Sequence, residues 1–172
     1  MNKEKKNIIL TGFMGTGKTT VGKLLTAELG YEFIDTDKVI ETRCGRSIPE
    51  IFRESGEDSF RSMEADLVRE LAEREGLVIA TGGRLMLDPA NAAALSRKGL
   101  VFCLAATPDE IFSRVMSAQQ SRPLLNVPEP GERIVELLQQ RAEGYGRFYQ
   151  VMTNDKDPKE ITKELVDIIL AD

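Results

Sequence analysis

The chain has 172 residues, of which 41% are hydrophobic and 30% charged, which suits one globular domain with a substantial core. Its net charge is −5 and it has no block of basic residues, which argues against a nucleic-acid partner. The sequence contains no histidine, so a Ser-His-Asp triad, a Cys-His pair and a His-ligated zinc ion are excluded.

Cysteine usage and apolar runs indicate the cellular compartment. Cys44 and Cys103 lack the spacing of a metal site, and Cys103 lies in an apolar run that is typical of a buried strand. The longest apolar runs, such as Leu100–Ala106, are too short to cross a bilayer, and the first residues contain no apolar leader. We therefore expect a reduced, cytoplasmic protein with no membrane partner, and we expect a monomer.

The first half of the chain alternates apolar, β-branched runs with helical patterns. A run of that kind without polar interruption is typical of a buried strand, and apolar residues three and four positions apart indicate one face of a helix. In chain order these patterns predict strand Asn7–Thr11, helix Lys18–Leu29 closed by Gly30, strand Glu32–Asp35, helix Lys38–Arg43, helical structure over Ile48–Glu75 with a break at Ser55-Gly56, and strand Leu77–Ala80.

The second half continues the alternation, interrupted by one polar segment. Residues 118–131 contain three prolines and predict a mobile loop. Thr107 stands before Pro108 as the expected cap of a helix. The predicted elements are, in order, helix Ala90–Arg97, strand Leu100–Ala105, helix Pro108–Ser117, a helix that opens over Glu132–Gln140, strand Val151–Thr153 and helix Pro158–Leu170.

Continuous apolar strands that alternate with helices predict a parallel sheet covered on both faces. The fold class is therefore α/β, with three layers (α/β/α) around a five-stranded parallel sheet. We find no linker or repeat, so we expect residues 1–172 to form a single domain that includes the mobile loop 118–131. Ligands of such sheets bind at the carboxyl ends of the strands, so the residues that follow each strand are the candidates for function.

A glycine-rich segment joins the first predicted strand to the first helix. Gly12–Thr19, with the sequence GFMGTGKT, fits the phosphate-loop pattern G-x-x-x-x-G-K-[ST]. Its backbone N–H groups and the helix N-terminus can surround a phosphate, Lys18 can reach the β- and γ-phosphates, and the Thr19 hydroxyl can ligate Mg²⁺. The alternative is a glycine-rich turn without a ligand. We expect ATP and Mg²⁺ as cofactors, with the nucleotide held by Gly12, Gly15, Thr16, Gly17, Lys18, Thr19 and Thr20.

Two carboxylates follow the second predicted strand. Asp35 and Asp37 are two residues apart, so one can face a metal ion while the other faces a substrate. The alternative is that either one caps the next helix by accepting hydrogen bonds from its first N–H groups. The neighbouring phosphate loop favours the functional interpretation.

These residues, together with later motifs, resemble the shikimate kinase family over nearly the whole chain and in the same order. Phosphate loops are common to many families, whereas the later motifs are much more specific. The matching segments are Gly12–Lys23, Phe33–Asp37, Ile40-Glu41, Gly56–Arg61 with Glu64, Ala80–Gly83, Arg122–Leu125 and Arg141–Tyr145.

The resemblance implies an acceptor site for shikimate, a cyclohexene carboxylic acid with three hydroxyls. Its carboxylate would bind Arg61, Arg141 and the backbone of Gly82-Gly83, since guanidinium and N–H groups recognise carboxylates. Asp37 would hold the reacting hydroxyl and take its proton. The single-residue alternatives are that Arg61 is an exposed helix residue and that Arg141 pairs with Glu136 or Glu143 on its helix.

The resemblance also implies how charge is neutralised during transfer. Asp35 would lie near the metal ion with Thr19, and Arg122 would close over the phosphates, although in a loop of prolines it could instead be solvated. The catalytic residues are then Lys18, Asp37 and Arg122. For the adenine end of the nucleotide the candidates are Arg114 and Lys156.

Two positions depart from the family pattern. Arg84 stands where the family usually has a third glycine, and Gly144 stands where it often has an apolar residue. The Arg84 side chain can point into solvent over an unchanged backbone, or it can indicate a different acceptor. The expected function is shikimate kinase; the alternatives are a kinase of the same fold for another hydroxy acid or polyol, similar to gluconate kinases, and a nucleotide-binding module without transfer activity.

Overall fold

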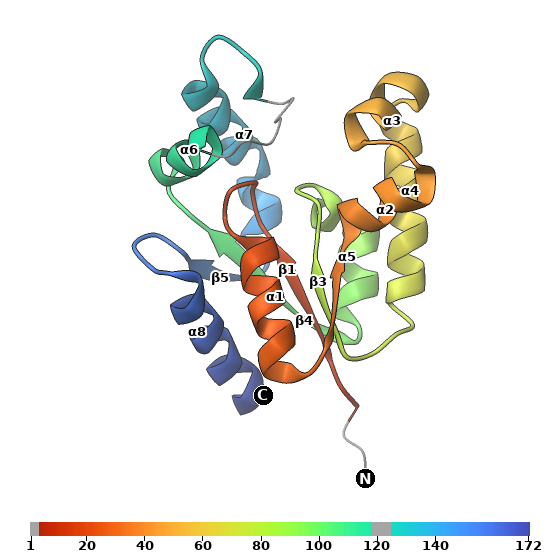
Figure 1. The fold of residues 1–172 in the computed structure, drawn as a ribbon, viewed down its shortest axis with the longest axis vertical. Helices are drawn as coiled ribbons and strands as arrows, with labels where there is room; N and C mark the ends of the chain where they lie inside the picture. Colours follow the sequence, from red (N-terminus) through yellow and green to blue (C-terminus); the bar gives the residue numbers. More distant parts are fainter. Residues whose placement is uncertain (1–3, 118–124) are drawn as a thin grey trace.

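The structure is a computed structural model that describes residues 4–117 and 125–172. At its centre lies a five-stranded parallel sheet with the strand order β2-β3-β1-β4-β5 (Figure 1). The strands are β1 (Asn7–Thr11), β2 (Glu32–Asp35), β3 (Leu77–Ala80), β4 (Gly99–Ala105) and β5 (Tyr149–Met152). The chain reverses its direction of travel across the sheet after β2, so β1 and β3 lie at the point where ligands of such sheets bind.

Helices cover both faces of the sheet, as predicted. They are α1 (Lys18–Leu29), α2 (Thr36–Cys44), α3 (Ile48–Ser55), α4 (Glu57–Leu71), the 3-10 turn η1 (Leu85–Leu87), α5 (Pro89–Ser96), α6 (Pro108–Ser117), α7 (Pro130–Tyr145) and α8 (Pro158–Ala171). Ile8 and Leu10 of β1 pack with α1 and α8, whereas Ile9 packs on the opposite face with α4 and α5. This alternation is what a strand with two buried faces requires.

A third apolar cluster lies beside the phosphate loop rather than across the sheet. Phe13 of the loop packs with Ile111 of α6, Ile134 of α7 and Tyr145 at the end of α7. The loop is therefore held against α6 and α7 by buried apolar contacts. Among the described residues, no helix has both the length and the hydropathy that a membrane span needs.

Several predicted bounds were wrong by a few residues. The helical prediction over Ile48–Glu75 was too long, because α4 ends at Leu71. The predicted break at Ser55-Gly56 is confirmed: Gly56 has φ 86° and ψ 165°, a conformation that ends one helix and begins the next. The last strand, Tyr149–Met152, begins two residues and ends one residue earlier than the predicted strand Val151–Thr153.

The predicted loop 118–131 is shorter than expected at its C-terminal end. Pro130 begins α7, since the fixed φ of proline suits the first turn of a helix, so this proline marked a helix start and not a loop. Residues 118–124 lie outside the described part of the chain, and Arg122 is among them.

Candidate active site

The phosphate loop bends sharply between β1 and α1. Gly12 has φ 134°, and a Cβ atom there would stand 2.3 Å from the carbonyl oxygen of Leu104, so only glycine fits this position. Gly15 and Gly17 also have positive φ angles. The buried Thr16 hydroxyl donates a 2.7 Å hydrogen bond to the carbonyl oxygen of Phe13, so this side chain closes the loop from within.

Lys18 lies at the mouth of this loop. Its ammonium group donates to the carbonyl oxygens of Gly12 at 2.6 Å and Phe13 at 3.0 Å. The positive charge is therefore held beside the loop and the N-terminus of α1, which both favour anions. The neighbouring Thr19 and Thr20, in the first turn of α1, are exposed to solvent.

Asp35 caps the next helix, which was the alternative to a functional role, and it also contacts the phosphate loop. Its Oδ1 accepts a 3.2 Å hydrogen bond from the Lys38 N–H and so caps α2. Its Oδ2 accepts from the Thr19 hydroxyl at 3.4 Å. The carboxylate thus joins the first turn of α2 to the phosphate loop.

These oxygens fit a magnesium ion bound with nucleotide. Mg²⁺ prefers oxygen ligands and is usually held by one or two side chains together with substrate phosphates and waters. Thr19 and Asp35 provide one hydroxyl and one carboxylate beside the loop. Within residues 4–117 and 125–172 no three Cys, Asp or Glu side chains gather as a metal site of their own.

Asp37 is a half-buried carboxylate between the phosphate loop and α4. It lies in the first turn of α2, two residues after Asp35. The pKa of Asp37 is raised from 3.8 to about 6, mainly by burial and also by the Asp35 and Glu41 carboxylates, while Lys18 and Arg61 partly oppose the rise. Lys18 on the nucleotide side and Arg61 on the opposite side are therefore both close enough to act on this group.

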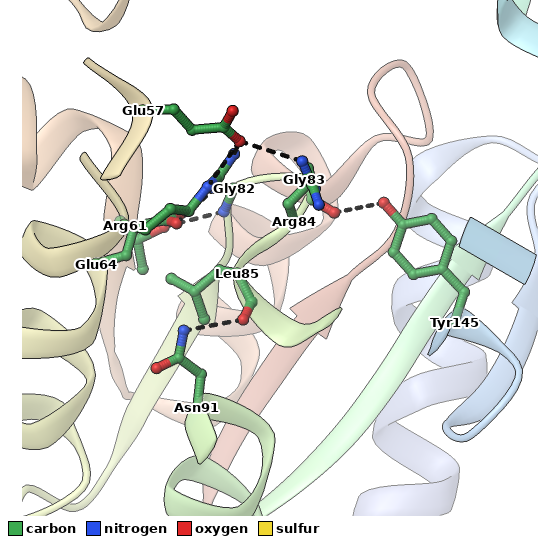
Figure 2. Close-up of polar contacts among 10 residues, drawn as sticks. Glu57, Arg61, Glu64, Gly82, Gly83, Arg84, Leu85, Asn91 and Tyr145 are labelled. Carbon is green, nitrogen blue, oxygen red and sulfur yellow. Dashed lines mark hydrogen bonds and ion pairs between the residues drawn. The ribbon is translucent and has the colours of Figure 1, made fainter. Parts of the chain in front are cut away.

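Arg61 projects from α4 into a network of carboxylates (Figure 2). Its Nη1 donates to Glu64 Oε1 at 2.6 Å, and its Nη2 donates to Glu57 Oε1 at 3.3 Å. The guanidinium also lies 5.1 Å from the ring centroid of Phe60. Arg61 is thus a positioned side chain and not a solvated one, which decides against the simpler alternative.

Glu64 is a functional candidate that the sequence did not identify beyond its place in a motif. It is 1% exposed, and its Oε2 has no hydrogen-bond partner among the described residues. Burial raises the pKa of Glu64 to about 7, against the opposing effect of Arg61. The spacing of Glu57, Arg61 and Glu64, four and then three residues along one helix, is the signal that could have predicted this network.

The loop after β3 forms the floor of the same pocket. A Cβ atom on Gly82 would stand 2.6 Å from Asp37 Oδ1, so Asp37 lies directly against the glycine backbone. The Gly82 N–H donates to the Thr36 hydroxyl at 3.0 Å, so Gly82 contributes close approach and not an N–H donor, unlike the expectation from the sequence. The Tyr145 hydroxyl donates to the Gly83 carbonyl at 2.5 Å and holds the loop from the α7 side (Figure 2).

Arg141 completes the set of cations. It is 8% exposed, and its guanidinium lies 5.4 Å from the ring centroid of Phe13. A Cβ atom on Gly83 would stand 3.2 Å from its Nη1, so Arg141 lies against the loop after β3. In the described residues Glu136 pairs with Arg133 and Glu143 with Arg147, which removes the alternative that Arg141 serves a surface pair on its own helix.

The two candidates for the adenine end of the nucleotide, Arg114 and Lys156, lie in different surroundings. Arg114 donates to the carbonyl oxygen of Gly15 at 3.1 Å and to the Thr153 hydroxyl at 3.0 Å, so it joins the phosphate loop to the segment after β5. Lys156 pairs with Glu164 of α8 at 3.0 Å, on the exposed side of that segment. Thr153, which the sequence did not single out, positions Arg114.

The two departures from the family pattern have local explanations. Arg84 has φ −110° and ψ −5°, angles that any residue adopts, and its side chain is half-exposed. At Gly144 a Cβ atom would stand 2.4 Å from Leu87 Cδ2, so the glycine makes room for a leucine that packs there. Neither residue closes the pocket.

Comparison with known proteins agrees with this geometry. The family model described as shikimate kinase matches residues 14–170. The chain is 45% identical over 163 residues to a shikimate kinase of Caldanaerobacter subterraneus subsp. tengcongensis, with 94% of each chain covered. It is also similar to the structure of a shikimate kinase from Acinetobacter baumannii in complex with shikimate, with a TM-score of 0.90, 36% identity, and 97% and 94% of the two chains covered.

A more distant structural neighbour addresses the alternative acceptor. A gluconokinase from Sinorhizobium meliloti 1021 has a TM-score of 0.65 at 17% identity, over 99% of this chain and 94% of that one, which shows a shared fold alone. The family model and the relatives at high coverage decide the assignment. The chain belongs to the shikimate kinase family of ATP-dependent phosphotransferases that act on an alcohol group.

Proposed function

We propose that the chain transfers the γ-phosphoryl group of ATP to a hydroxyl of shikimate, giving 3-phosphoshikimate and ADP for aromatic amino acid biosynthesis. The observation that carries the proposal is the position of Asp37, a half-buried carboxylate on which Lys18 from the phosphate loop and Arg61 from α4 both act. A kinase that transfers a phosphoryl group to a bound hydroxyl uses such a carboxylate, placed between the nucleotide site and the acceptor site, to orient the hydroxyl and accept its proton.

The acceptor half recognises an anion that also carries hydroxyls. Arg61 and Arg141 lie on opposite sides of the Gly82-Gly83 loop, and both can donate to a carboxylate. Asp37 accepts a hydrogen bond from the reacting hydroxyl, and Gly82 lets the ring approach the backbone because it has no side chain. Shikimate has this combination of one carboxylate and several hydroxyls.

In the reaction Asp37 orients the hydroxyl and takes its proton as the bond to phosphorus forms. Lys18 is in place to neutralise charge on the transferring phosphoryl oxygens, and the phosphate loop holds the rest of the nucleotide. Mg²⁺, held by Thr19 and Asp35 together with the nucleotide, supplies further neutralisation of phosphate charge. In this proposal Arg122, which lies outside the described residues, closes over the phosphates and helps to exclude water, as the family resemblance implies.

The same proposal describes a cytoplasmic monomer with no nucleic-acid or membrane partner. An acceptor pocket with Asp37, Arg61 and Arg141 has no use in a module that only binds nucleotide. No feature of the site favours gluconate or another polyol over shikimate, since Arg84 leaves the backbone of the loop in an ordinary conformation.

A coupled ADP-release assay tests the proposal. ATP, Mg²⁺ and shikimate should give sustained ADP release, while gluconate, quinate and simple polyols should give little above the rate without acceptor. Asp37→Asn should bind nucleotide normally and lose the shikimate-dependent rate. A stronger response to another acceptor, or ADP release that ignores shikimate, would contradict the proposal.

A further inference from the structure

Arg84 lies at the mouth of the acceptor pocket and is joined to it by one carboxylate. Its Nη1 donates to Glu57 Oε1 at 3.1 Å, and Arg61 donates to the same oxygen from Nη2 at 3.3 Å and from Nε at 3.4 Å (Figure 2). Glu57 is therefore shared between a cation that lines the pocket and a cation at its rim.

The shared carboxylate connects two walls that are far apart in the sequence. Glu57 begins α4, immediately after the Gly56 break, and Arg84 follows the Gly82-Gly83 loop after β3. The remaining link on the α4 side runs from Arg61 to Glu64, whose buried carboxylate lies against Gly82. The Arg84–Glu57 pair thus ties the first turn of α4 to the pocket floor.

The charges around Arg61 explain what this pair does. Without Arg84, two carboxylates, Glu57 and Glu64, would surround one guanidinium, and an incoming carboxylate would have to compete with both of them for Arg61. Arg84 supplies a second cation for Glu57 and so offsets one negative charge. The guanidinium of Arg61 then remains attractive to an anionic acceptor.

We propose that Arg84 is a positioning residue of the acceptor site, which acts through Glu57 to hold Arg61 ready for an anionic acceptor and to fix α4 against the loop after β3. This inference rests on the proposed function, since the anion in question is the acceptor's carboxylate. Arg84 itself stays at the rim, with its side chain 53% exposed.

The effect should be modest because the pair is exposed. Exposed ion pairs contribute enough to change a dissociation constant about two- to five-fold. Arg84→Gln and Arg84→Gly should therefore raise the shikimate Kd, measured by calorimetry, and the shikimate KM by about two- to five-fold, with kcat and the ATP KM nearly unchanged. Arg84→Lys should restore part of the affinity because it keeps the charge.

Three controls separate positioning from general stability. Arg97→Gln removes another exposed Arg–Glu pair, with Glu73 at 2.9 Å, at the far end of α4, and should leave shikimate affinity unchanged. In the Glu57→Gln background the further change Arg84→Gln should add little, because the partner is already neutral. Raising the salt concentration should weaken shikimate binding less in Arg84→Gln than in the unmodified chain.

Each outcome decides one point. Weaker shikimate binding in Arg84→Gln, an unaffected Arg97→Gln and a non-additive double variant would support the inference. Unchanged or tighter binding in Arg84→Gln and Arg84→Gly, with normal binding to the unmodified chain, would overturn this inference alone. If the unmodified chain bound no shikimate, the proposed function would fail together with it.

Discussion

The buried carboxylate of Glu64 and the half-buried carboxylate of Asp37 both lie against Gly82. A Cβ atom on Gly82 would stand 3.3 Å from Glu64 Oε2 and 2.6 Å from Asp37 Oδ1. Burial is the main cause that raises the pKa of both carboxyls, the Asp37 carboxylate adds to the rise for Glu64, and of the two only Glu64 accepts a direct hydrogen bond from Arg61. Without a ligand, Asp37 and Glu64 therefore hold their protons to a higher pH than ordinary carboxyl groups do.

Catalysis should depend on the ionised form of Asp37. Its pKa is raised to about 6, so Asp37 is mostly ionised at neutral pH and increasingly protonated below pH 6. A protonated carboxyl cannot take a proton from the acceptor hydroxyl. We expect kcat/KM for shikimate to fall about tenfold per pH unit below about pH 6, measured by ADP release from pH 5 to 8. A flat profile across this range would remove Asp37 as the base.

Glu64→Gln should change the pH dependence of stability. Because the pKa of Glu64 rises from 4.5 to about 7 on folding, the folded chain binds more protons than the unfolded chain between these values. The stabilisation from this group is full below pH 4.5 and is lost as the pH rises through 7. Because glutamine does not ionise, Glu64→Gln does not lose stability in this pH range, and its amide oxygen can still accept a hydrogen bond from Arg61.

Urea unfolding at pH 5 and pH 8 measures this effect. The variant should gain free energy of unfolding relative to the unmodified chain as the pH rises, by about 1–3 kcal/mol. Glu73→Gln, at an exposed position, is the matched control and should show no such gain. A difference between Glu64→Gln and the unmodified chain that is equal at both pH values would contradict the assignment.

Gly82→Ala should damage the acceptor site and spare the nucleotide site. A methyl group would stand 2.6 Å from Asp37 Oδ1, closer than side chains tolerate, so the carboxylate must move. Misplacement of a reacting group by about 1 Å lowers rates about 10²-fold. We expect kcat/KM for shikimate to fall by about that factor, while calorimetry shows ATP binding within a few-fold of normal. Loss of ATP binding would point instead to a wider collapse of the fold.

Lys18→Ala should abolish transfer while the fold persists. The ammonium lies beside the carbonyl oxygens of Gly12 and Phe13 at the mouth of the phosphate loop. Removing a cation that stabilises charge in transfer lowers kcat by about 10²–10³-fold. Steady-state ADP release measures the loss, and circular dichroism confirms the fold. Substantial remaining activity would refute the role of Lys18; Lys23→Ala, an exposed lysine one turn further along α1, should be nearly unaffected.

The sequence predicted the sheet and most of its helices because their signals are local. Apolar runs and glycines mark β1, α1 and β3, and the glycine pattern of residues 12–17 is explained by backbone angles and close approach that only glycine allows. Pro130 misled the prediction because proline suits both a loop and the first turn of a helix. Local signals place such an element but do not fix its first residue.

The site could be predicted only in part, because side-chain partners depend on tertiary contacts. The structure brings several of the predicted site residues together, since Asp37 and Arg141 lie against Gly82-Gly83 and Arg61 is close enough to act on Asp37. The role of the Gly82 N–H was not foreseen, since its acceptor, Thr36, lies 46 positions away. The burial of Glu64 and the bond from Tyr145 to Gly83 likewise arise only when α4 and α7 pack on the loop.

Asp35 links the two sides of the site through its two carboxylate oxygens. One of its oxygens ends at the first turn of α2 and the other reaches Thr19, so the helix that carries Asp37 is fastened to the nucleotide side by a single carboxylate. A shift of α2 by one residue would therefore displace both Asp37 and the contact of Asp35 with Thr19. A change at Asp35 would likewise affect the nucleotide side and the acceptor side together.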